Sequence, residues 1–246
     1  DLRDYLWYSK LFSLKMSNKE NSKLEAILIM PSAGKGKRFL EDGYDIPKPL
    51  LKVSNKPLFV QALNDLPYTK QKLIVITEKF EYSQNLKEQI EKNKLSCKIE
   101  FISRDTKGQS ETCYLAIRDL NPDKSLFVSS CDHGVIYNKE KFDSLINDKE
   151  IDVIVWGCRD YPNALRNPEM YGWISYKNNS IYEVSVKKRI QNDNCNAIVI
   201  GSFFFRKISL FKRLVEEQFE KKDLVNNEFY VDSLINIAIK KGLNIK

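Results

Sequence analysis

Apolar runs of strand length alternate with amphipathic stretches along most of this chain. From residue 24 onward, the apolar runs predict strands near 26–30, 73–77, 98–103, 125–130 and 152–157. The stretches between them predict helices near 56–66, 81–93, 109–120 and 139–147. This alternation is typical of a mostly parallel sheet with helices on both faces. We therefore expect an α/β fold.

The pattern changes after Tyr171. Two runs of alternating apolar and polar residues flank the segment Lys177-Asn178-Asn179-Ser180 and predict a β-hairpin. A strand at 197–205 and helices near 207–220 and 228–241 are expected next, and residues 243–245 are suited to the start of another strand. The sequence therefore predicts an inserted hairpin followed by a return to the main sheet.

Residues 1–23 are set apart from this pattern. Their apolar positions fit one stripe of a helix, and the polar stretch 17–23 follows it. We expect an N-terminal helical appendage or linker that packs on the domain or joins it to a preceding, fused one. The domain itself is expected to span residues 24–246.

Composition narrows the class of protein. With 246 residues, 42% of them hydrophobic, the chain can bury a substantial core. The formal charge is +7, but 40 basic residues are interleaved with 33 acidic ones and form no arginine-rich arm. This pattern argues against nucleic acid as a partner and favours a small anionic substrate.

Cysteine use and hydropathy indicate the compartment. The five cysteines are odd in number, widely spaced and mostly within apolar runs, which fits reduced thiols in a cytosolic protein. We find no apolar stretch of membrane-spanning length and no signal peptide. A soluble, cytoplasmic protein without a membrane partner is expected, and a homo-oligomer is left open.

The loop after the first apolar run carries the most informative chemistry. It contains Ser32, Gly34 and Gly36, whose backbone amides can approach an anion closely, together with Lys35, Lys37 and Arg38. Binding of a triphosphate explains this combination of residues better than a solvated basic turn does. A Walker loop ends in Gly-Lys-Ser/Thr, which is missing here, so the loop is not of that type. It is not a dinucleotide fingerprint either, because the third glycine is missing.

Lys48 lies between two prolines, Pro47 and Pro49, which restrict the backbone and can direct its ammonium group. Taken alone, the segment is as well explained by an ordinary loop. In combination with the preceding basic loop it indicates a second phosphate contact.

Asp132 follows the apolar run 126–130, at a position where a carboxylate could bridge Mg²⁺ to phosphate oxygens. The adjacent His133 is the only histidine and has no second ligand at metal spacing, so we expect it to line the loop or the substrate. A Ser-His-Asp hydrolase is disfavoured because no Gly-x-Ser-x-Gly elbow precedes a helix.

Two further segments have open interpretations. Gln109 and Ser110 open a predicted helix, where they could contact a base or ribose or simply form a helix cap. Lys187, Lys188 and Arg189 follow the hairpin and could reach a second phosphate or form a solvated charge run.

The loop Ala33-Gly34-Lys35-Gly36-Lys37-Arg38, followed by Pro47-Lys48-Pro49 and the stretch to Pro57, resembles a known family. These motifs are similar to those of the nucleoside-triphosphate transferases typified by sugar-1-phosphate nucleotidylyltransferases. The resemblance covers 24–246 and implies a Rossmann-like sheet of the glycosyltransferase-A type. Residues 225–230, VNNEFY, are similar to a branch associated with surface polysaccharide synthesis.

The resemblance implies a role for each matched residue. Catalytic roles fall to Arg38 at the β- and γ-phosphates, Lys48 at the α-phosphate and Lys188 at the acceptor phosphate. Asp132 would hold Mg²⁺. Nucleotide contacts are implied for Ser32, Ala33, Gly34, Lys35, Gly36, Lys37, Gln109 and Ser110, and substrate contacts for Tyr171, Gly172 and Glu228.

The sequence also departs from the family pattern. Lys187 stands where the family has a glutamate, and Cys131 stands where it has a glycine. The chain stops before the region where many members carry a second metal-binding aspartate, so the domain is expected to be C-terminally incomplete.

The expected reaction is Mg²⁺-dependent nucleotidyl transfer from CTP or another nucleoside triphosphate to a phosphorylated sugar or other small phosphorylated metabolite. Pyrophosphate would be released, and the product would be an activated precursor for surface polysaccharide. One alternative is a nucleotide-sugar-dependent glycosyltransferase, although Cys131-Asp132-His133 lacks the usual Asp-x-Asp. The other is a non-catalytic nucleotide-binding or regulatory module. The base and the acceptor are left open.

Overall fold

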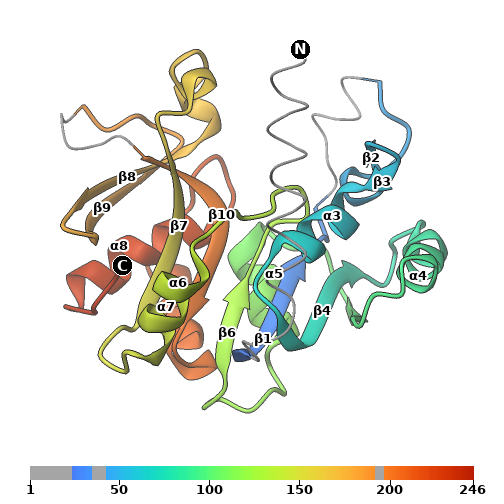
Figure 1. Ribbon diagram of the computed structural model, residues 1–246, viewed down its shortest axis with the longest axis horizontal. Helices are drawn as coiled ribbons and strands as arrows, with labels where there is room; N and C mark the ends of the chain where they lie inside the picture. Colours follow the sequence, from blue (N-terminus) through green and yellow to red (C-terminus); the bar gives the residue numbers. More distant parts are fainter. Residues whose placement is uncertain (1–23, 35–42, 192–196) are drawn as a thin grey trace.

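The structure is a computed structural model that describes residues 24–34, 43–191 and 197–246. Its centre is an eight-stranded sheet with the strand order β5-β4-β1-β6-β10-β8-β9, in which β7 also pairs with β10. A mixed α/β architecture with a largely parallel centre confirms the predicted fold class (Figure 1). The helical appendage predicted at 1–23 lies outside the described residues.

Four parallel strands form one half of the sheet: β1 (Leu24–Pro31), β4 (Thr69–Thr77), β5 (Lys98–Ile102) and β6 (Ser125–Val128). The central strand β1 is buried on both faces, and Leu28, Ile29 and Met30 are fully inaccessible. Continuous apolar runs are typical of parallel strands that are covered on both sides.

The other half of the sheet is antiparallel. The strand β10 (Ala197–Phe205) pairs with β6, β7 (Val153–Arg159) and β8 (Gly172–Lys177), and β9 (Ser180–Val186) forms the hairpin with β8. Asn178 and Asn179 connect the hairpin with φ of 51° and 60°, as a two-residue type I′ turn requires. The predicted hairpin is therefore confirmed. A separate ribbon of β2 (Lys52–Val53) and β3 (Lys56–Pro57) precedes the helix that begins at Leu58.

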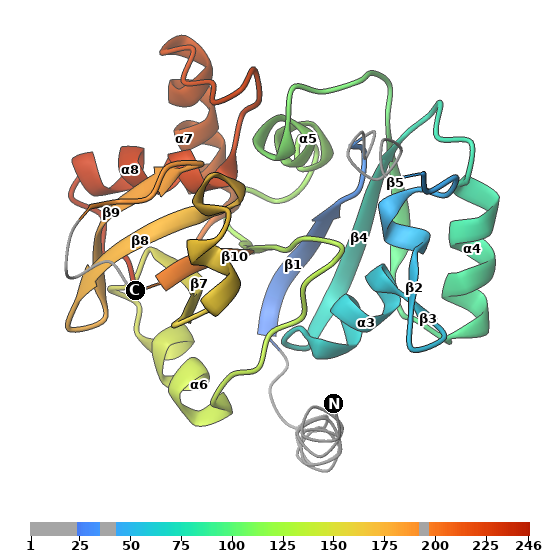
Figure 2. The same cartoon turned by 90° about the horizontal axis from the view of Figure 1, so that it is seen from above.

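Helices cover both faces of the sheet (Figure 2). One core cluster contains apolar residues of α5 (Gln109–Ala116), α7 (Ile208–Glu220) and α8 (Val231–Lys240). The second contains those of α3 (Leu58–Asp65), α4 (Ser83–Lys92) and α6 (Lys139–Asn147). Three short 3₁₀ helices complete the described part: η1 (Lys48–Leu50), η2 (Pro162–Leu165) and η3 (Pro168–Met170).

Helix boundaries differ from the prediction where local backbone chemistry intervenes. The helix expected from residue 56 starts at Leu58, because Lys56 pairs in β3 and Pro57 is its N-cap. The helix expected from 228 starts at Val231, because Asn226 and Asn227 form a turn with positive φ values. At 243–245, where the start of a strand is expected, the structure has a single parallel β-bridge between Ile245 and Val153.

Arg206 links the sheet to the end of α6. Its guanidinium donates to the carbonyls of Ile146 at 2.6 Å and Asp148 at 2.6 Å, while Nε donates to Ile151 at 2.9 Å. Burial lowers its pKa, and the neighbouring Asp148 and Asp152 oppose that shift. One side chain therefore binds carbonyls at the end of α6 and in the segment that follows it.

We expect Arg206→Met to lower the free energy of unfolding by about 2–4 kcal/mol, since several hydrogen bonds from a charged donor are lost. Lys207→Met is the matched control, because it removes only the exposed ion pair of Lys207 with Asp123 and should cost less than about 1 kcal/mol. Urea denaturation at constant protein concentration measures both. Equal midpoints for the two variants would contradict this role of Arg206.

Cys97, Cys113, Cys131 and Cys158 carry free thiols, as expected for these four, and Cys195 lies outside the described residues. Within the described segments, no helix has the length and apolar character needed to cross a membrane.

Candidate functional site

The candidate site forms where β1 and β6 end side by side. Ile29 pairs with Val128 in parallel register, and the Ser129 amide donates to the Ile29 carbonyl at 3.0 Å. The loops that follow these strands therefore leave the sheet at the same edge. In open α/β sheets, ligands bind at this edge.

The structure brings Lys48 and Asp132 together. Lys48 Nζ lies 2.6 Å from Asp132 Oδ2, although the residues come from different loops. Lys48 begins η1, in which Pro49 and Leu50 are buried, so the backbone that carries the ammonium group is fixed to the core. The two predicted phosphate and metal contacts thus form one charged pair.

Asp132 is ionised at neutral pH. Burial raises the pKa of its carboxyl, but hydrogen bonds and charges from His133 and Lys48 outweigh burial and hold it well below its usual range. His133 Nδ1 lies 3.2 Å from Asp132 Oδ1 and 3.3 Å from Ser130 Oγ. His133 therefore contacts the carboxylate directly, which the sequence did not predict.

Cys131 occupies the position before this carboxylate. Burial, followed by the charge of Asp132, raises the pKa of its thiol to about 11, so the thiol is protonated at neutral pH. The side chain packs in the same core cluster as Met30 and Phe127. Its role here is packing beneath the site.

The first loop is only partly described. The Ser32 amide donates to the Val75 carbonyl at 2.7 Å, and the buried Ser32 hydroxyl lies 3.4 Å from the Met30 carbonyl. Ala33 is half-buried and Gly34 is exposed. The Ser32 backbone thus belongs to the sheet, and the loop becomes accessible from the following residues. Lys35, Gly36, Lys37 and Arg38 lie outside the described residues.

A second loop is fixed against the segment before α8. The Phe229 amide donates to the Lys107 carbonyl at 2.5 Å, and the Ser110 amide donates to the Phe229 carbonyl at 3.1 Å. Gly108 between them has φ of 125°, and a Cβ there would lie 2.7 Å from the Phe229 oxygen. Position 108 therefore requires glycine, and half-buried Gln109 starts α5 beside this contact.

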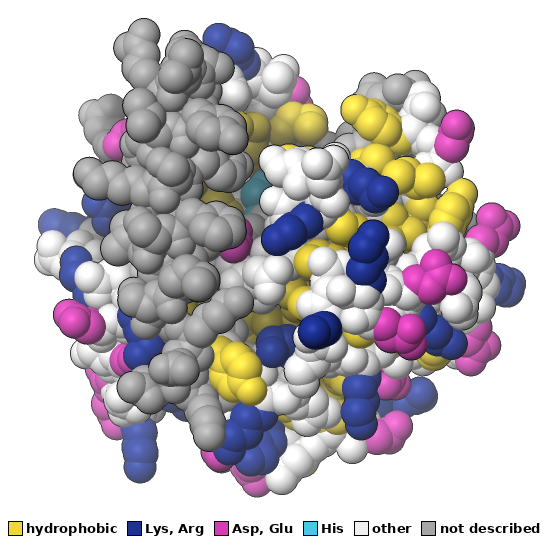
Figure 3. Space-filling model, turned by 45° about the vertical axis from the view of Figure 1, so that its right-hand side comes forward, with side chains coloured by type: hydrophobic (Ala, Val, Ile, Leu, Met, Phe, Trp, Pro, Cys, Tyr) yellow, Lys and Arg dark blue, Asp and Glu magenta, His cyan; other side chains and the backbone are white. Residues whose placement is uncertain are grey.

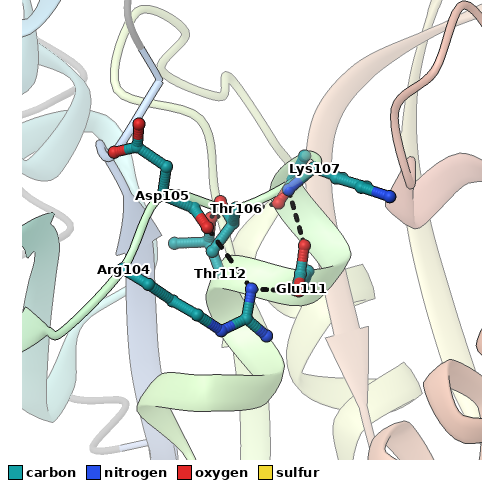
Figure 4. A network of polar contacts seen from close by, with 7 residues as sticks. Arg104, Asp105, Thr106, Lys107, Glu111 and Thr112 are labelled. Atoms are coloured by element: carbon teal, nitrogen blue, oxygen red, sulfur yellow. Dashed lines mark hydrogen bonds and ion pairs between the residues drawn. The ribbon is translucent and has the colours of Figure 1, made fainter.

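Glu111 organises the same loop from within α5 (Figure 4). Its carboxylate accepts from the Lys107 amide at 2.5 Å and lies 2.6 Å from Arg104 Nη1. Thr106 and Thr112 are joined by a 2.6 Å hydrogen bond between their hydroxyls. The sequence analysis missed Glu111, although a glutamate three residues after an N-cap is a known capping signal.

The end of the hairpin contacts the predicted substrate residues. The Lys187 amide donates to the Tyr171 carbonyl at 3.0 Å, and Lys187 Nζ donates to the Met170 carbonyl at 2.6 Å. Lys188 is exposed, and the Arg189 guanidinium lies 5.6 Å from the centre of the Trp173 ring. Of the three basic residues, Lys187 is therefore the one with contacts to Met170 and Tyr171.

The strand β10 connects this hairpin with Asp132. A Cβ at Gly172 would lie 3.2 Å from the Val199 side chain, and a Cβ at Gly201 would lie 3.3 Å from Ser130. Two residues along a strand span about 7 Å. The hairpin end and the Asp132 loop are therefore close neighbours. Glu228 is exposed and precedes Phe229, which is hydrogen-bonded to the Lys107–Ser110 loop. Glu228 therefore lies beside that loop and not at the hairpin end.

The donor groups fit a magnesium ion that arrives with phosphate. Across the described ranges, no three His, Cys, Asp or Glu side chains gather into a metal site. Magnesium is commonly held by one or two carboxylates plus substrate phosphates. An ionised Asp132 meets that requirement, whereas a structural zinc needs four protein ligands.

Comparisons with known proteins agree with the fold. Among solved structures, the chain is similar to a nucleoside-diphosphate-sugar pyrophosphorylase from Vibrio cholerae, with 18% identity, coverage of 89% of each chain and a TM-score of 0.68. It is similar to an inositol-1-phosphate CTP transferase from T. maritima, with 14% identity, coverage of 92% of this chain and 86% of the other, and a TM-score of 0.66.

A UDP-glucose pyrophosphorylase complexed with UDP-glucose is also similar, with 19% identity, coverage of 88% and 87%, and a TM-score of 0.64. At these identities the similarities establish the fold. A search of curated proteins finds no significant match. The family model of nucleotidyl transferases matches residues 26–233. The chain therefore belongs to the nucleotidyl transferase family of enzymes.

Proposed function

We propose that this enzyme transfers a nucleotidyl group from a nucleoside triphosphate to a small phosphorylated acceptor and releases pyrophosphate. The ion pair between Lys48 and Asp132, at the end of two parallel strands, is the observation that carries the proposal. It combines a cation for phosphate oxygens with an ionised carboxylate for a metal ion. Neither group alone would favour this reaction over simple anion binding.

The chemistry requires positioning rather than a covalent intermediate. An oxygen of the acceptor phosphate attacks the α-phosphorus, a new P–O bond forms, and the bond to the leaving pyrophosphate breaks. No proton transfer is required, because the attacking phosphate is already an anion. Lys48 would offset negative charge on the α-phosphate and the attacking phosphate.

Asp132 would hold a magnesium ion, which would supply charge neutralisation at the phosphate oxygens. Without a cation, this carboxylate would repel the triphosphate. The contact from His133 Nδ1 orients Oδ1, and Lys48 orients Oδ2. The side chain is thus held in one orientation before substrate arrives.

The remaining predicted site residues are assigned to separate parts of the two substrates. Ser32, Ala33, Gly34 and the loop to Arg38 would bind the leaving phosphates. Gln109 would contact the base or ribose, whereas Ser110 beside it is fully buried. Lys188, Tyr171 and Gly172 would contact the acceptor, and Glu228 lies beside the nucleotide loop instead. The fixed Lys107–Ser110 loop supports the nucleotide assignment, because a rigid loop holds the start of α5 in place for the ligand.

We infer that the acceptor is a sugar phosphate. Two similar structures are described as sugar-nucleotide pyrophosphorylases, and another as an inositol-1-phosphate CTP transferase. CTP as the donor, a product for surface polysaccharide and a cytoplasmic location belong to the same proposal. The sequence similarity of residues 225–230 to the polysaccharide branch supports them.

A pyrophosphate-release assay tests this function. The purified chain is incubated with each of the four ribonucleoside triphosphates or dTTP, with Mg²⁺, and with a panel of hexose 1-phosphates and inositol 1-phosphate. Release that requires both a triphosphate and an acceptor supports the proposal. Triphosphate binding without release would instead indicate a nucleotide-binding module.

We expect Glu111→Gln to raise the KM for the triphosphate about 10-fold, since weakening one charged hydrogen bond and an ion pair loosens the loop. The kcat should change less than 3-fold or so, because Lys48 and Asp132 are untouched. Steady-state kinetics at saturating acceptor measure the split. Glu91→Gln on exposed α4 is the control, and an unchanged KM in Glu111→Gln would contradict the role of the loop.

A further inference from the structure

Asp232 packs against the predicted acceptor side of the site. It lies in the first turn of α8, and a Cβ at Gly172 would overlap its Oδ2 atom. A side chain at position 172 would therefore displace this carboxylate. The contact places a carboxylate directly against the first residue of β8.

The neighbours of Asp232 come from three elements. Lys187, after β9, is the charged group that acts on it, and its Nζ donates to the Met170 carbonyl. Lys187 Nζ also lies 5.8 Å from the centre of the Tyr230 ring, immediately before α8. The carboxylate of Asp232 thus lies beside Gly172, with the ammonium of Lys187 and the ring of Tyr230 nearby.

The buried carboxylate of Asp232 lowers the folding stability of the protein when no substrate is bound. Burial raises the pKa of Asp232 to about 6, and its own backbone amide and Lys187 only partly oppose the shift. A raised carboxyl pKa means that stability declines as pH rises from about 4 to about 6, because the folded state binds the proton more tightly. At neutral pH, Asp232 therefore destabilises the fold, as functional carboxylates often do.

Strand β10 links the Asp232 contact with the loop that carries Asp132. Gly172 contacts Val199, and Gly201, two residues further along β10, contacts Ser130 before Asp132. On the other side, Phe229 is hydrogen-bonded to the Lys107–Ser110 loop. The segment from Phe229 to Asp232 thus reaches from the nucleotide loop to the hairpin end.

We propose that Asp232 is an acceptor-binding residue that accepts a hydrogen bond from a hydroxyl group of a phosphorylated sugar or polyol, while Lys187 contacts an anionic oxygen of the same molecule. The inference rests on the proposed nucleotidyl transfer. A hydroxyl donor would supply the ionised carboxylate with the hydrogen bond that offsets its burial. Acceptors that lack hydroxyl groups near the phosphate should therefore be poor substrates.

Asp232→Asn tests this role, because asparagine keeps the shape and removes the charge. With the best acceptor of the hexose and inositol 1-phosphate panel, its KM for that acceptor should rise about 10-fold or more. The KM for the triphosphate should stay within about 2-fold, and the melting temperature should rise at pH 7.5. Asp119→Asn, an exposed carboxylate after α5, should change none of these quantities.

The pH dependence separates binding from a structural role. In the unmodified enzyme, the acceptor KM should fall as pH rises through about 6, because Asp232 must be ionised. The acceptor phosphate also ionises near pH 6, but it does so equally in Asp232→Asn. The difference between the two pH profiles of the acceptor KM therefore reports the ionisation of Asp232.

The outcomes are distinguishable. No pyrophosphate release with any pair of substrates would overturn the nucleotidyl transfer and the inference with it. Normal release in which Asp232→Asn keeps the original acceptor KM would overturn only the inference. A lower melting temperature with equal losses for both substrates would show that Asp232 is structural, which also overturns it.

Discussion

Replacing Asp132 by asparagine is expected to lower kcat/KM for pyrophosphate release by about 10³-fold, the scale seen when a group that stabilises transition-state charge is removed. Asparagine retains the shape and one oxygen, so Lys48 keeps an acceptor. What disappears is the negative charge that would hold magnesium beside the phosphates. Initial rates over a magnesium titration measure the effect.

The magnesium dependence identifies the cause of the loss. In Asp132→Asn, the half-saturating magnesium concentration should rise together with the fall in rate. Asp123→Asn, which removes an exposed carboxylate before β6, at the opposite end of that strand from Asp132, should leave both quantities unchanged. Full magnesium-dependent release by Asp132→Asn would show that the metal assignment is wrong.

Replacing Lys48 by methionine should lower kcat by about 10²- to 10³-fold and change the triphosphate KM less, since the charge acts mainly on the transition state. Methionine keeps most of the aliphatic stem, so the change isolates the ammonium group. Single-turnover kinetics at saturating triphosphate measure the chemical step.

Two further variants make this experiment specific. Lys48→Arg retains the charge but not the compact geometry, so only part of the rate should return. Lys52→Met, on the exposed strand β2 four residues later, controls for the loss of a nearby positive charge. If Lys48→Met and Lys52→Met were equally active, Lys48 would have no role in the chemistry.

Figure 3 shows lysine or arginine side chains beside exposed hydrophobic side chains on one face of the molecule. Lys52 and Lys56 are exposed, as are the nearby Tyr44, Ile46 and Val53. Because many basic side chains lie on the surface, composition does not indicate which lysine contacts the phosphates. Lys48 is distinguished by its contact with Asp132, not by its residue type.

The meeting of Lys48 with Asp132 could be predicted because a simple rule governs it. Both residues follow predicted strands or their loops, and the ends of neighbouring parallel strands share one edge of the sheet. The buried runs that form β1 and β6 are strong patterns, and their pairing follows from the α/β alternation. Neither the distance nor the contact with His133 could follow from such a rule.

Asp232 and Glu111 could not be predicted in the same way. Their importance depends on atoms of distant segments: Gly172 lies 60 residues before Asp232, and Arg104 reaches Glu111 from outside the helix. In a linear pattern, each is an ordinary acidic residue in the first turn of a helix, where such residues are common. Burial and contact, which periodicity does not encode, distinguish them.

The central claim is that the α-phosphorus of the triphosphate is transferred to the acceptor. The most direct measurement follows two labels, [α-³²P] and [γ-³²P], in parallel reactions with the active pair of substrates. We predict that the α label appears in the sugar nucleotide and the γ label in pyrophosphate, at equal rates. Recovery of the α label only in free nucleotide, or of the γ label in orthophosphate, would contradict nucleotidyl transfer.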